Sequence, residues 1–514
     1  MNNKQQHRRV EVAIIGTGFG GLGMAYYLRQ SGVESFVVLE KRDEVGGVWR
    51  ENTYPGAGCD VPSHFYSWSF EPHYPWQHRY AKQYEIKEYM SHVARKHDLY
   101  RHICFGQEVI SADFDEARAL WVIRSANGDV TEAAMLISAV GQLHRPVIPN
   151  IPGQEQFKGE RFHSANWNHD FDMTGKRVAV IGAGASAVQF VPEIVKRVDK
   201  LHVFQRSPGW VGPKVEKAFS ASERWLLDHI PLIHDLDRLR IFLVCEALGY
   251  AYRGHRWAER LLTGISKTQI RLQVKDKKLR EQLTPDYPIG CKRLLLTTDW
   301  LRALVKPNVE VVSGGVTEMT ESAVRGEDGV LREVDAIIYG TGFAATEFLA
   351  PMQVRGLDGA VLHERWAKGA NAYLGMAVSG FPNFFTLYGP NSNLGSGSVI
   401  YMLERQQRYI TKLIRDRKEK AWSYVDVNAE AHAAFNDEIR RRSEGSTFEG
   451  DCQSWYKTAE GVNTNNWVGS MREYSRRTAT PNLSHFEFVR LSENMKQSAP
   501  KNDNPILEET AEAV

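Results

Sequence analysis

Residues 157–187 read FKGERFHSANWNHDFDMTGKRVAVIGAGASA, and this stretch decides the predicted fold. From Arg177 it is an apolar run, typical of a buried parallel strand, and then a turn with Gly182, Gly184 and Ala187 that leads into a helical pattern. Such glycines let backbone N–H groups approach a pyrophosphate, and the next helix points its N-terminus at the phosphates. A turn of the same kind, VAIIGTGFGG at residues 12–21, opens the chain. The sequence therefore predicts two dinucleotide-binding units.

The residue that ends the second strand of each unit distinguishes the two dinucleotides. Glu40 lies 24 residues after Gly16, and Arg206 lies 24 residues after Gly182. A carboxylate at this place accepts hydrogen bonds from a ribose 2′-hydroxyl, whereas an arginine pairs with a 2′-phosphate. This indicates FAD in the first unit and NADPH in the second. The plainer alternatives are a glycine-rich turn in the first unit and, for Arg206, a solvated charge at a strand end.

Composition excludes several other classes of protein. The chain has 514 residues, with 64 Lys and Arg against 62 Asp and Glu, so the net charge of +2 gives no reason to expect nucleic acid as a partner. Five scattered cysteines form no CxxC pair and no Cys/His cluster, which predicts no metal site and favours a reducing cytoplasm. The basic N-terminus lacks the apolar stretch of a signal peptide. The apolar run at 241–252 is too short to span a membrane, so we expect a buried helix there and no stable membrane insertion.

The order of the patterns predicts an α/β protein with two Rossmann-like dinucleotide-binding domains, for FAD and NADP, and a helical insertion. Three prolines in QLHRPVIPNIPG indicate a crossover near residue 150. We expect an alternating run at 111–124 to form hairpin strands that turn at Asn127-Gly128. The predicted parts are a discontinuous FAD domain (1–150 and 340–494), an NADP domain (151–339) with its helical insertion (215–280), and a disordered polar tail (495–514).

Two further segments contain charged and aromatic residues that could bind a cofactor or take part in a reaction. The loop GGVWRENTYPGAGCDVPSHFYSW at 46–68 places aromatic side chains beside Asp60. This composition could bind the flat ring of a cofactor, with the carboxylate beside it. Equally, the aromatic side chains could form a small hydrophobic cluster of their own, with the aspartate in solvent. The segment PIGCKRLLL at 288–296 places Lys292 and Arg293 next to an apolar run, where adjacent cations are unusual unless they face a phosphate or a reactive anion.

With these residues in place, the chain resembles the Baeyer–Villiger monooxygenases over nearly its whole length. Their fingerprint FxGxxxHxxxW is matched, and so is a second signature, GxWxxxx[FY]PG followed by an aspartate. The matching residues are Phe157, Gly159, His163 and Trp167, and then Gly47, Trp49, Tyr54, Pro55, Gly56 and Asp60. One departure is Asn168, where the family usually has Pro or Asp. The segment DCQSWYKTAEGV at 451–462 resembles the acetophenone-type members more than the cyclohexanone-type ones.

The resemblance implies a reaction in which NADPH reduces FAD, O2 adds to give a peroxyflavin, and a ketone becomes an ester or lactone. Arg293 matches the family's catalytic arginine, and Asp60 matches the carboxylate that positions it; the plainer alternative is an ion pair that only bridges domains. His163 is assigned a structural role in domain geometry. The implied FAD-binding residues are Gly16, Gly18, Gly21, Glu40, Gly46, Gly47, Trp49, Asp60, Val61 and Tyr66. The implied NADP-binding residues are Gly182, Gly184, Ser186, Ala187, Arg206, Ser207, Lys292 and Trp455.

Three other functions share parts of this layout. A flavin monooxygenase that oxygenates nitrogen or sulfur has no need of Arg293 and Asp60. A disulfide reductase needs a redox cysteine pair near the flavin, and the sequence shows none. A non-catalytic NADP sensor predicts no NADPH oxidation. The size and shape of the ketone, the carbon that migrates and the oligomeric state have no signal in the sequence.

Overall fold

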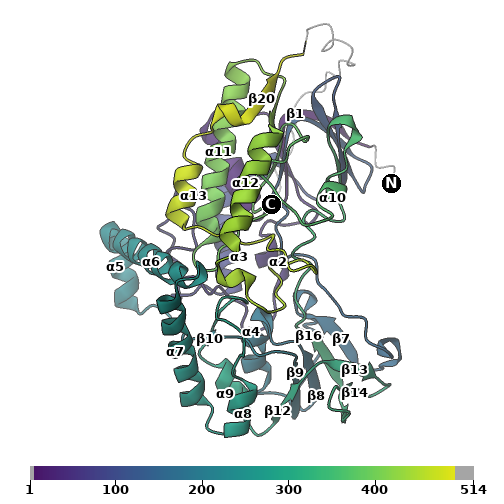
Figure 1. The fold of residues 1–514 in the computed structure, drawn as a ribbon, viewed down its shortest axis with the longest axis vertical. Helices are drawn as coiled ribbons and strands as arrows, with labels where there is room; N and C mark the ends of the chain where they lie inside the picture. Colours follow the sequence, from purple (N-terminus) through teal and green to yellow (C-terminus); the bar gives the residue numbers. More distant parts are fainter. Residues whose placement is uncertain (1–4, 492–514) are drawn as a thin grey trace.

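The strand before each glycine turn lies inside its own sheet in the computed structural model, which describes residues 5–491 (Figure 1). Strand β1 (His7–Ile15) is flanked by β2 and β6, and β8 (Arg177–Ile181) is flanked by β9 and β16. Both strands end in fully or nearly fully buried residues, because neighbours cover both faces. The predicted α/β class, with two Rossmann-like units and a helical insertion, is confirmed. The tail predicted at 495–514 lies outside the described residues.

The first sheet has eight strands in the order β17-β4-β5-β6-β1-β2-β3, with β18 also paired to β6. Its further strands are β2 (Phe36–Leu39), β3 (Ile103–Cys104), β4 (Val109–Asp115), β5 (Leu120–Ser125), β6 (Val130–Ser138), β17 (Gln353–Arg355) and β18 (Phe384–Thr386). Strands β5 and β18 share one edge of β6, β5 along its first residues and β18 along its last. The Asn127-Gly128 turn joins β5 to β6, and a further turn at 116–119 divides the predicted run at 111–124 into β4 and β5.

The second sheet has five parallel strands in the order β12-β9-β8-β16-β7. Its further strands are β7 (Glu160–His163), β9 (Lys200–Gln205), β12 (Val309–Ser313) and β16 (Ala336–Tyr339). A small antiparallel sheet of β13 (Val316–Met319), β14 (Ala323–Gly326) and β15 (Leu331–Glu333) follows β12. The first sheet draws its strands from residues 7–138 and 353–386, and the second from 160–339. We propose that the domain boundaries predicted near residues 150 and 340 follow this division.

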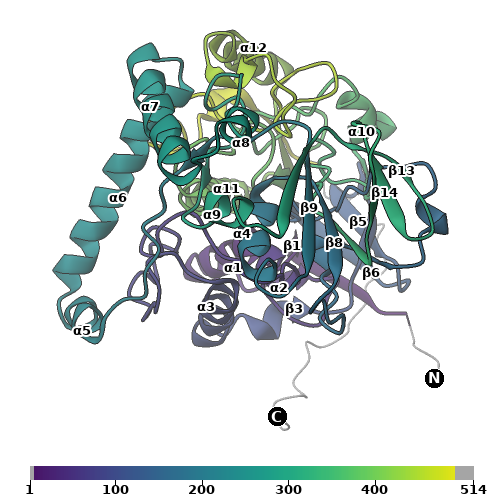
Figure 2. The same cartoon turned by 90° about the horizontal axis from the view of Figure 1, so that it is seen from below.

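The predicted insertion at 215–280 is helical and stands along one flank of the molecule (Figure 2). It consists of α5 (Ala221–His229), α6 (Pro231–Tyr252), α7 (Arg256–Gln273) and α8 (Lys277–Gln282). The chain leaves for these helices through β10 (Val211–Gly212) and returns through β11 (Leu295–Leu296), and the two short strands pair in parallel. Among the described residues, no helix is long and apolar enough to cross a membrane.

Helices near the C-terminus support the first glycine turn. Helix α11 (Val399–Glu419) packs against α1 (Phe19–Gln30), where Gln407 Nε2 donates to the carbonyls of Phe19 and Gly20. The remaining elements are α2 (Val48–Glu51), α3 (Gln83–Lys96), α4 (Ala185–Ile194), α9 (Trp300–Leu304), α10 (Leu362–Arg365), α12 (Ala429–Ser443), α13 (Met471–Arg477), β19 (Tyr424–Val427) and β20 (Phe486–Val489).

Candidate functional site

A cavity of about 1280 Å³ runs between the two glycine turns. Its wall takes residues from both sheets, from the loop at 46–68 and from the C-terminal loop at 453–455. The predicted site residues that line it are Gly16, Gly18, Glu40, Gly46, Gly47, Trp49, Asp60, Val61, Tyr66, Gly182, Gly184, Ser186, Arg206, Ser207, Lys292, Arg293 and Trp455. The fold therefore brings together at one cavity residues that are spread over more than 400 positions of the chain.

On the side of the first turn, Glu40 is a buried carboxylate held by the backbone. Thr17 N donates to Glu40 Oε2 at 2.9 Å, and Arg42 N donates to Oε1 at 2.9 Å. Gly16 has φ +99°, and a Cβ there would lie 2.9 Å from the carbonyl oxygen of Ala139. A side chain at Gly16 would therefore push the turn away from the end of β6, so the tight turn requires glycine. The fixed carboxylate and the bare backbone fit the adenosine end of FAD.

On the side of the second turn, two cations and a hydroxyl converge. Lys292 donates a hydrogen bond to Ser207 Oγ, and Arg206 follows strand β9 at the cavity wall. Burial lowers the pKa of Lys292, and the charge of Arg206 lowers it further. Two like charges held this close favour an anion between them, as a 2′-phosphate would be. Sequence reasoning missed Glu327, which also lines this wall and accepts a hydrogen bond from Gly315 N at 2.8 Å.

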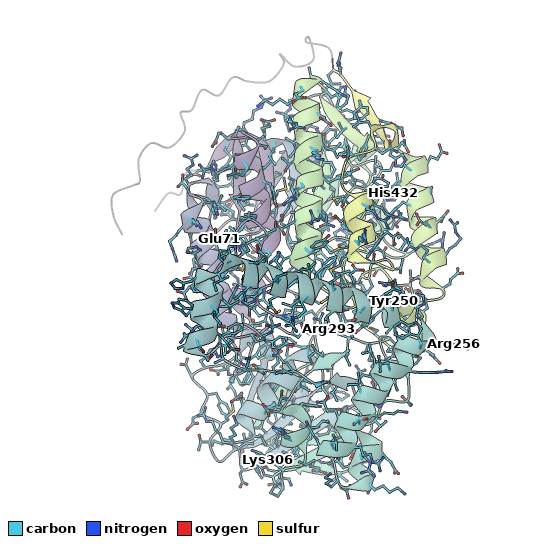
Figure 3. The ribbon with its side chains drawn as sticks, turned by 90° about the vertical axis from the view of Figure 1, so that its left-hand side faces the viewer. Glu71, Tyr250, Arg256, Arg293, Lys306 and His432 are labelled. Atoms are coloured by element: carbon cyan, nitrogen blue, oxygen red, sulfur yellow. A yellow bond between two sulfur atoms is a disulfide. The ribbon has the colours of Figure 1, made fainter. Side chains whose placement is uncertain are left out.

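Arg293 and Asp60 form a bidentate ion pair in the wall of the cavity. Arg293 Nη2 lies 2.7 Å from each oxygen of Asp60, and Nε donates to Oδ2 at 3.1 Å. The side chains of Arg293 and Asp60 are 31% and 23% exposed, and both line the cavity. Burial opposes ionisation of Asp60, but the guanidinium outweighs it and lowers the pKa of the carboxyl; Asp60 in turn raises the pKa of Arg293. Both groups therefore stay charged at neutral pH. Figure 3 shows Arg293 at mid-height in the molecule, below the upper helices.

The known proteins to which this chain is similar are monooxygenases. A Baeyer–Villiger monooxygenase of Streptomyces coelicolor is 41% identical to this chain over 490 residues, covering 95% of this chain and 94% of that protein. The chain belongs to the Baeyer–Villiger monooxygenase family. A second member, from Pseudomonas aeruginosa, is 40% identical over 90% of this chain and 88% of its own length.

Solved structures agree with this family assignment. An oxidized steroid monooxygenase bound to NADP superposes with a TM-score of 0.84 at 30% identity, over 94% of this chain and all of that one. A structure titled as an OTEMO complex with FAD and NADP gives 0.83 at 28% identity, over 93% of this chain and 99% of that one. The chain is thus an NADPH-dependent, FAD-binding monooxygenase.

Residues 13–224 also match the family model of pyridine nucleotide-disulphide oxidoreductases. This part of the monooxygenase contains both glycine turns and two cysteines, Cys59 and Cys104, neither of which is in a disulfide. The match therefore reflects the shared layout of two dinucleotide units.

Two predicted cofactor-binding residues, Gly21 and Ala187, do not line the cavity of the monooxygenase. A Cβ on Gly21 would lie 1.8 Å from the carbonyl oxygen of Gly16, and Ala187 is fully buried against Gly340. Both allow helix and strand to pack closely behind the turn. We propose that Gly21 and Ala187 support the two cofactor-binding turns by allowing this packing and do not contact the cofactors themselves.

The fingerprint residues of the family lie behind the cavity, since none of them lines it. Trp167 packs between Phe162 and Phe190, with ring centroids 5.1 and 5.3 Å away. His163 is 1% exposed, accepts a hydrogen bond from Ala165 N at 3.1 Å, and has its pKa lowered by burial. A neutral, packed imidazole supports the structural role that we propose for His163.

We propose Tyr388, which sequence reasoning missed, as a further site residue of the monooxygenase. Tyr388 lines the cavity with φ +58°, an uncommon value for a bulky residue, and donates to Asn393 Oδ1 at 2.7 Å. Burial raises the pKa of Tyr388 to about 12, although Arg293 opposes the rise. Burial likewise raises the pKa of Tyr456. The turn LYGPN that follows a predicted strand was the available signal for Tyr388.

The scattered cysteines of the monooxygenase, in which the sequence shows no CxxC pair, nevertheless include a bonded pair. Cys291 and Cys452 form a disulfide across 161 positions, with Cα atoms 6.3 Å apart. The spacing rules for cysteines could not find a pair that only the fold brings together. The fold also brings together a group of possible metal ligands that are far apart in the sequence. The ligand atoms of His73, His234 and Asp235 lie within 4.8 Å of one another, although the sequence shows no metal-ligand spacing there.

Proposed function

We propose that this monooxygenase inserts one oxygen atom of O2 beside the carbonyl carbon of a ketone and releases an ester or lactone. The observation that carries the proposal is the Arg293 guanidinium, which Asp60 fixes in the cavity wall between the two nucleotide cradles. Bound FAD, once reduced by NADPH, supplies the activation of O2. Oxygenation of nitrogen or sulfur makes no such demand for a fixed cation.

The chemistry assigned to Arg293 follows from its charge and its free donors. The carbonyl oxygen of a ketone gains negative charge when its carbon is attacked, and a fixed cation stabilises that charge without reorganising. Asp60 takes hydrogen bonds from Nε and Nη2, so the N–H groups of Nη1 remain to face the substrate. Because Asp60 raises its pKa, Arg293 keeps its proton throughout.

The remaining residues hold and orient the cofactors in this proposal. Glu40 binds the adenosine ribose of FAD, while Trp49 and Tyr66, joined by a 3.2 Å hydrogen bond, line the flavin end. Arg206, Ser207 and Lys292 bind the 2′-phosphate of NADPH. We place the enzyme in the cytoplasm, and we favour aryl or open-chain ketones over small rings because the segment at 451–462 resembles that of acetophenone-type members.

The test is ketone-dependent NADPH oxidation by the FAD-loaded enzyme in air, with product masses measured under ¹⁸O2. We expect esters or lactones that carry one ¹⁸O atom, and a loss of about 10²- to 10³-fold in kcat for Arg293→Ala. If only amines or sulfides gain oxygen, the proposed reaction is wrong. If Arg293→Ala forms esters at the native rate, the role proposed for Arg293 is wrong.

A further inference from the structure

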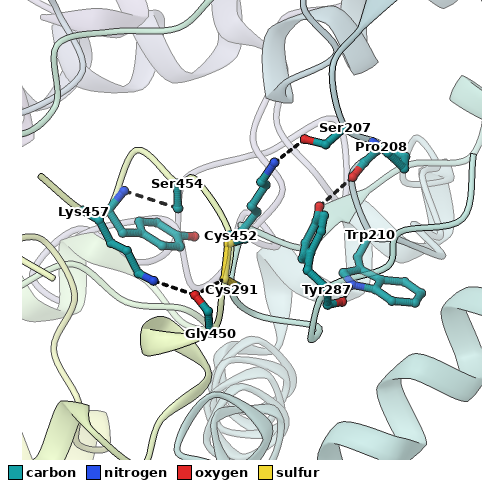
Figure 4. Close-up of a disulfide and its surroundings, with 11 residues drawn as sticks. Ser207, Pro208, Trp210, Tyr287, Cys291, Gly450, Cys452, Ser454 and Lys457 are labelled. Atoms are coloured by element: carbon teal, nitrogen blue, oxygen red, sulfur yellow. Dashed lines mark hydrogen bonds between the residues drawn. A yellow bond between two sulfur atoms is a disulfide. The ribbon is translucent and has the colours of Figure 1, made fainter. Parts of the chain in front are cut away.

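The disulfide between Cys291 and Cys452 joins two parts of the cavity wall (Figure 4). Cys291 directly precedes Lys292 and Arg293, which lie in the wall. Cys452 directly precedes Gln453, Ser454 and Trp455, which line the same cavity. The covalent link therefore fixes the C-terminal loop against the segment that holds the proposed phosphate site.

We propose that Cys291 and Cys452 form a reversible redox site, oxidised by hydrogen peroxide and reduced by a dithiol, whose oxidised state strengthens NADP binding by holding residues 453–455 in the wall. This inference uses the NADP binding of the family and does not depend on the substrate that is oxygenated.

The surroundings of the pair accommodate the dithiol as well as the disulfide. The carbonyl oxygen of Gly450 lies 3.1 Å from Cys291 Sγ and also accepts a hydrogen bond from Lys457 Nζ at 2.7 Å. In the reduced protein this carbonyl is ready to accept the S–H of Cys291, so no buried thiol is left without a partner. Cys452 is only half-buried, which opens one sulfur of the pair to small oxidants and reductants.

The other three cysteines, Cys59, Cys104 and Cys245, are not in a disulfide. Burial raises the pKa of Cys59 to about 12 and that of Cys245 to about 12, so both stay protonated and unreactive. Cys104 lies in the first sheet and is not in a disulfide. Oxidation is therefore expected to select the Cys291–Cys452 pair.

Apart from the disulfide, the loop around Cys452 has few buried residues that hold it to the rest of the protein. Within residues 451–462, Tyr456 is fully buried, whereas Asp451, Gln453 and the segment 459–462 are exposed. Segments with few buried contacts open locally at low cost. Reduction would leave Tyr456 as an anchor and let residues 451–455 move away from the wall. If the reduced loop occupies its bound position about a third to a tenth of the time, the apparent Kd for NADP⁺ rises about 3- to 10-fold.

The redox step balances with hydrogen peroxide as the two-electron oxidant. The Cys452 thiolate attacks one peroxide oxygen, the O–O bond breaks, and hydroxide leaves to give a sulfenic acid. The Cys291 thiolate then attacks that sulfur; the S–S bond forms, the S–O bond breaks and a second hydroxide leaves. The two thiol protons neutralise the hydroxides to two waters. A dithiol reverses the step by thiol–disulfide exchange and is itself oxidised to a disulfide. In a cytoplasm, where lasting disulfides are rare, such a pair senses the redox state.

The first measurement is the sulfur state of the full-length, FAD-loaded protein. Samples treated with hydrogen peroxide or dithiothreitol are desalted, denatured, alkylated with N-ethylmaleimide and digested for mass analysis. We expect a cross-linked peptide pair with Cys291 and Cys452 after peroxide, and alkylation of both after dithiothreitol. Cys59, Cys104 and Cys245 serve as internal controls that are alkylated in both samples. Failure of peroxide to form the cross-link would overturn the proposal.

The second measurement is the Kd for NADP⁺ in the two states, read from the flavin absorbance without turnover. We expect the Kd of the native protein to rise about 3- to 10-fold on reduction, and Cys452→Ser to match the reduced protein in either treatment. The matched control, Cys104→Ser, should respond like the native protein. An unchanged Kd on reduction, or an equal dithiothreitol effect in Cys452→Ser, would contradict the proposal. Since the native protein supplies both states, a folding defect in one variant cannot obscure the result.

Discussion

Asp60 accepts hydrogen bonds from two nitrogens of Arg293, which lies 233 positions further along the chain. The aspartate comes from the aromatic loop after the first nucleotide turn, and the arginine from the segment just before β11. Their contact therefore fixes the position of a cation relative to both nucleotide turns.

Replacing Asp60 with alanine should leave Arg293 charged but without its orienting partner. We expect kcat to fall about 100-fold, with a smaller change in the KM for NADPH, because a misplaced guanidinium stabilises charge poorly. Steady-state kinetics with the best ketone measure this. Asp172→Ala, which removes the exposed pair with Arg197, is the control and should keep native rates. Equal kcat in the two variants would show that Asp60 does not position Arg293.

Arg206→Ala should change the choice of nicotinamide cofactor. Loss of one charged hydrogen bond to the 2′-phosphate costs about 1.5–3 kcal/mol, so the KM for NADPH should rise roughly 10- to 100-fold while that for NADH changes little. Parallel titrations with the two cofactors make the measurement. Arg197→Ala, on the surface of the same part of the chain, should affect neither. A similar loss with NADPH and NADH would rule out a phosphate contact.

Gly56→Ala should weaken the contact between the aromatic loop and helix α4. Gly56 has φ +81°, and a Cβ there would lie 2.5 Å from the carbonyl oxygen of Gln189. Gly32 has a similar φ of +77° with nothing within 4 Å, so Gly32→Ala reports the backbone strain alone, about 1 kcal/mol. We expect the larger drop in Tm for Gly56→Ala. Equal drops would mean that α4 simply moves aside.

Asp426→Asn should stabilise the protein at high pH. Burial, together with the charge of Glu487, which lies opposite Asp426 across β19 and β20, raises the pKa of Asp426 to about 7, although the Gly380 N–H opposes the rise. Because the folded state binds this proton more tightly than the unfolded chain, stability falls as pH rises from about 4 to about 7. We expect a gain in Tm of about 2 °C at pH 8 that shrinks as the pH is lowered and disappears near pH 4. A gain of the same size at pH 8 and pH 4 would exclude the charge as its cause.

Sequence reasoning succeeded where the signal is local. The runs before Gly16 and Gly182 predict β1 and β8 because a buried parallel strand must be apolar on both faces. The matched positions of Glu40 and Arg206 follow from the fixed size of the strand–turn–helix–strand unit, and both residues line the cavity as that argument requires.

The sequence did not predict the features that depend on contacts between residues far apart in the chain. The positive φ of Tyr388 depends on Gln406, whose side chain accepts the Tyr388 N–H from helix α11. The pairing of Cys291 with Cys452 depends on how the two parts of the chain meet. The turn at 116–119 has no glycine or proline, and Ala119 adopts φ +52° there, so turn residues gave no warning.

The pairing of β10 with β11 brings together the two ends of the segment 213–294, which Arg238 also ties to Ser67 and Cys291 to Cys452. A segment whose ends meet in this way can be exchanged for one of another length or shape if these contacts are kept. The end of this segment also carries the proposed catalytic arginine, because Arg293 lies two positions before Leu295, the first residue of β11. If this segment is replaced by that of another family member, we therefore expect the chimeric protein to fold more often than it is active. Activity should be kept when the residues from Cys291 to Leu296 stay as they are in this chain.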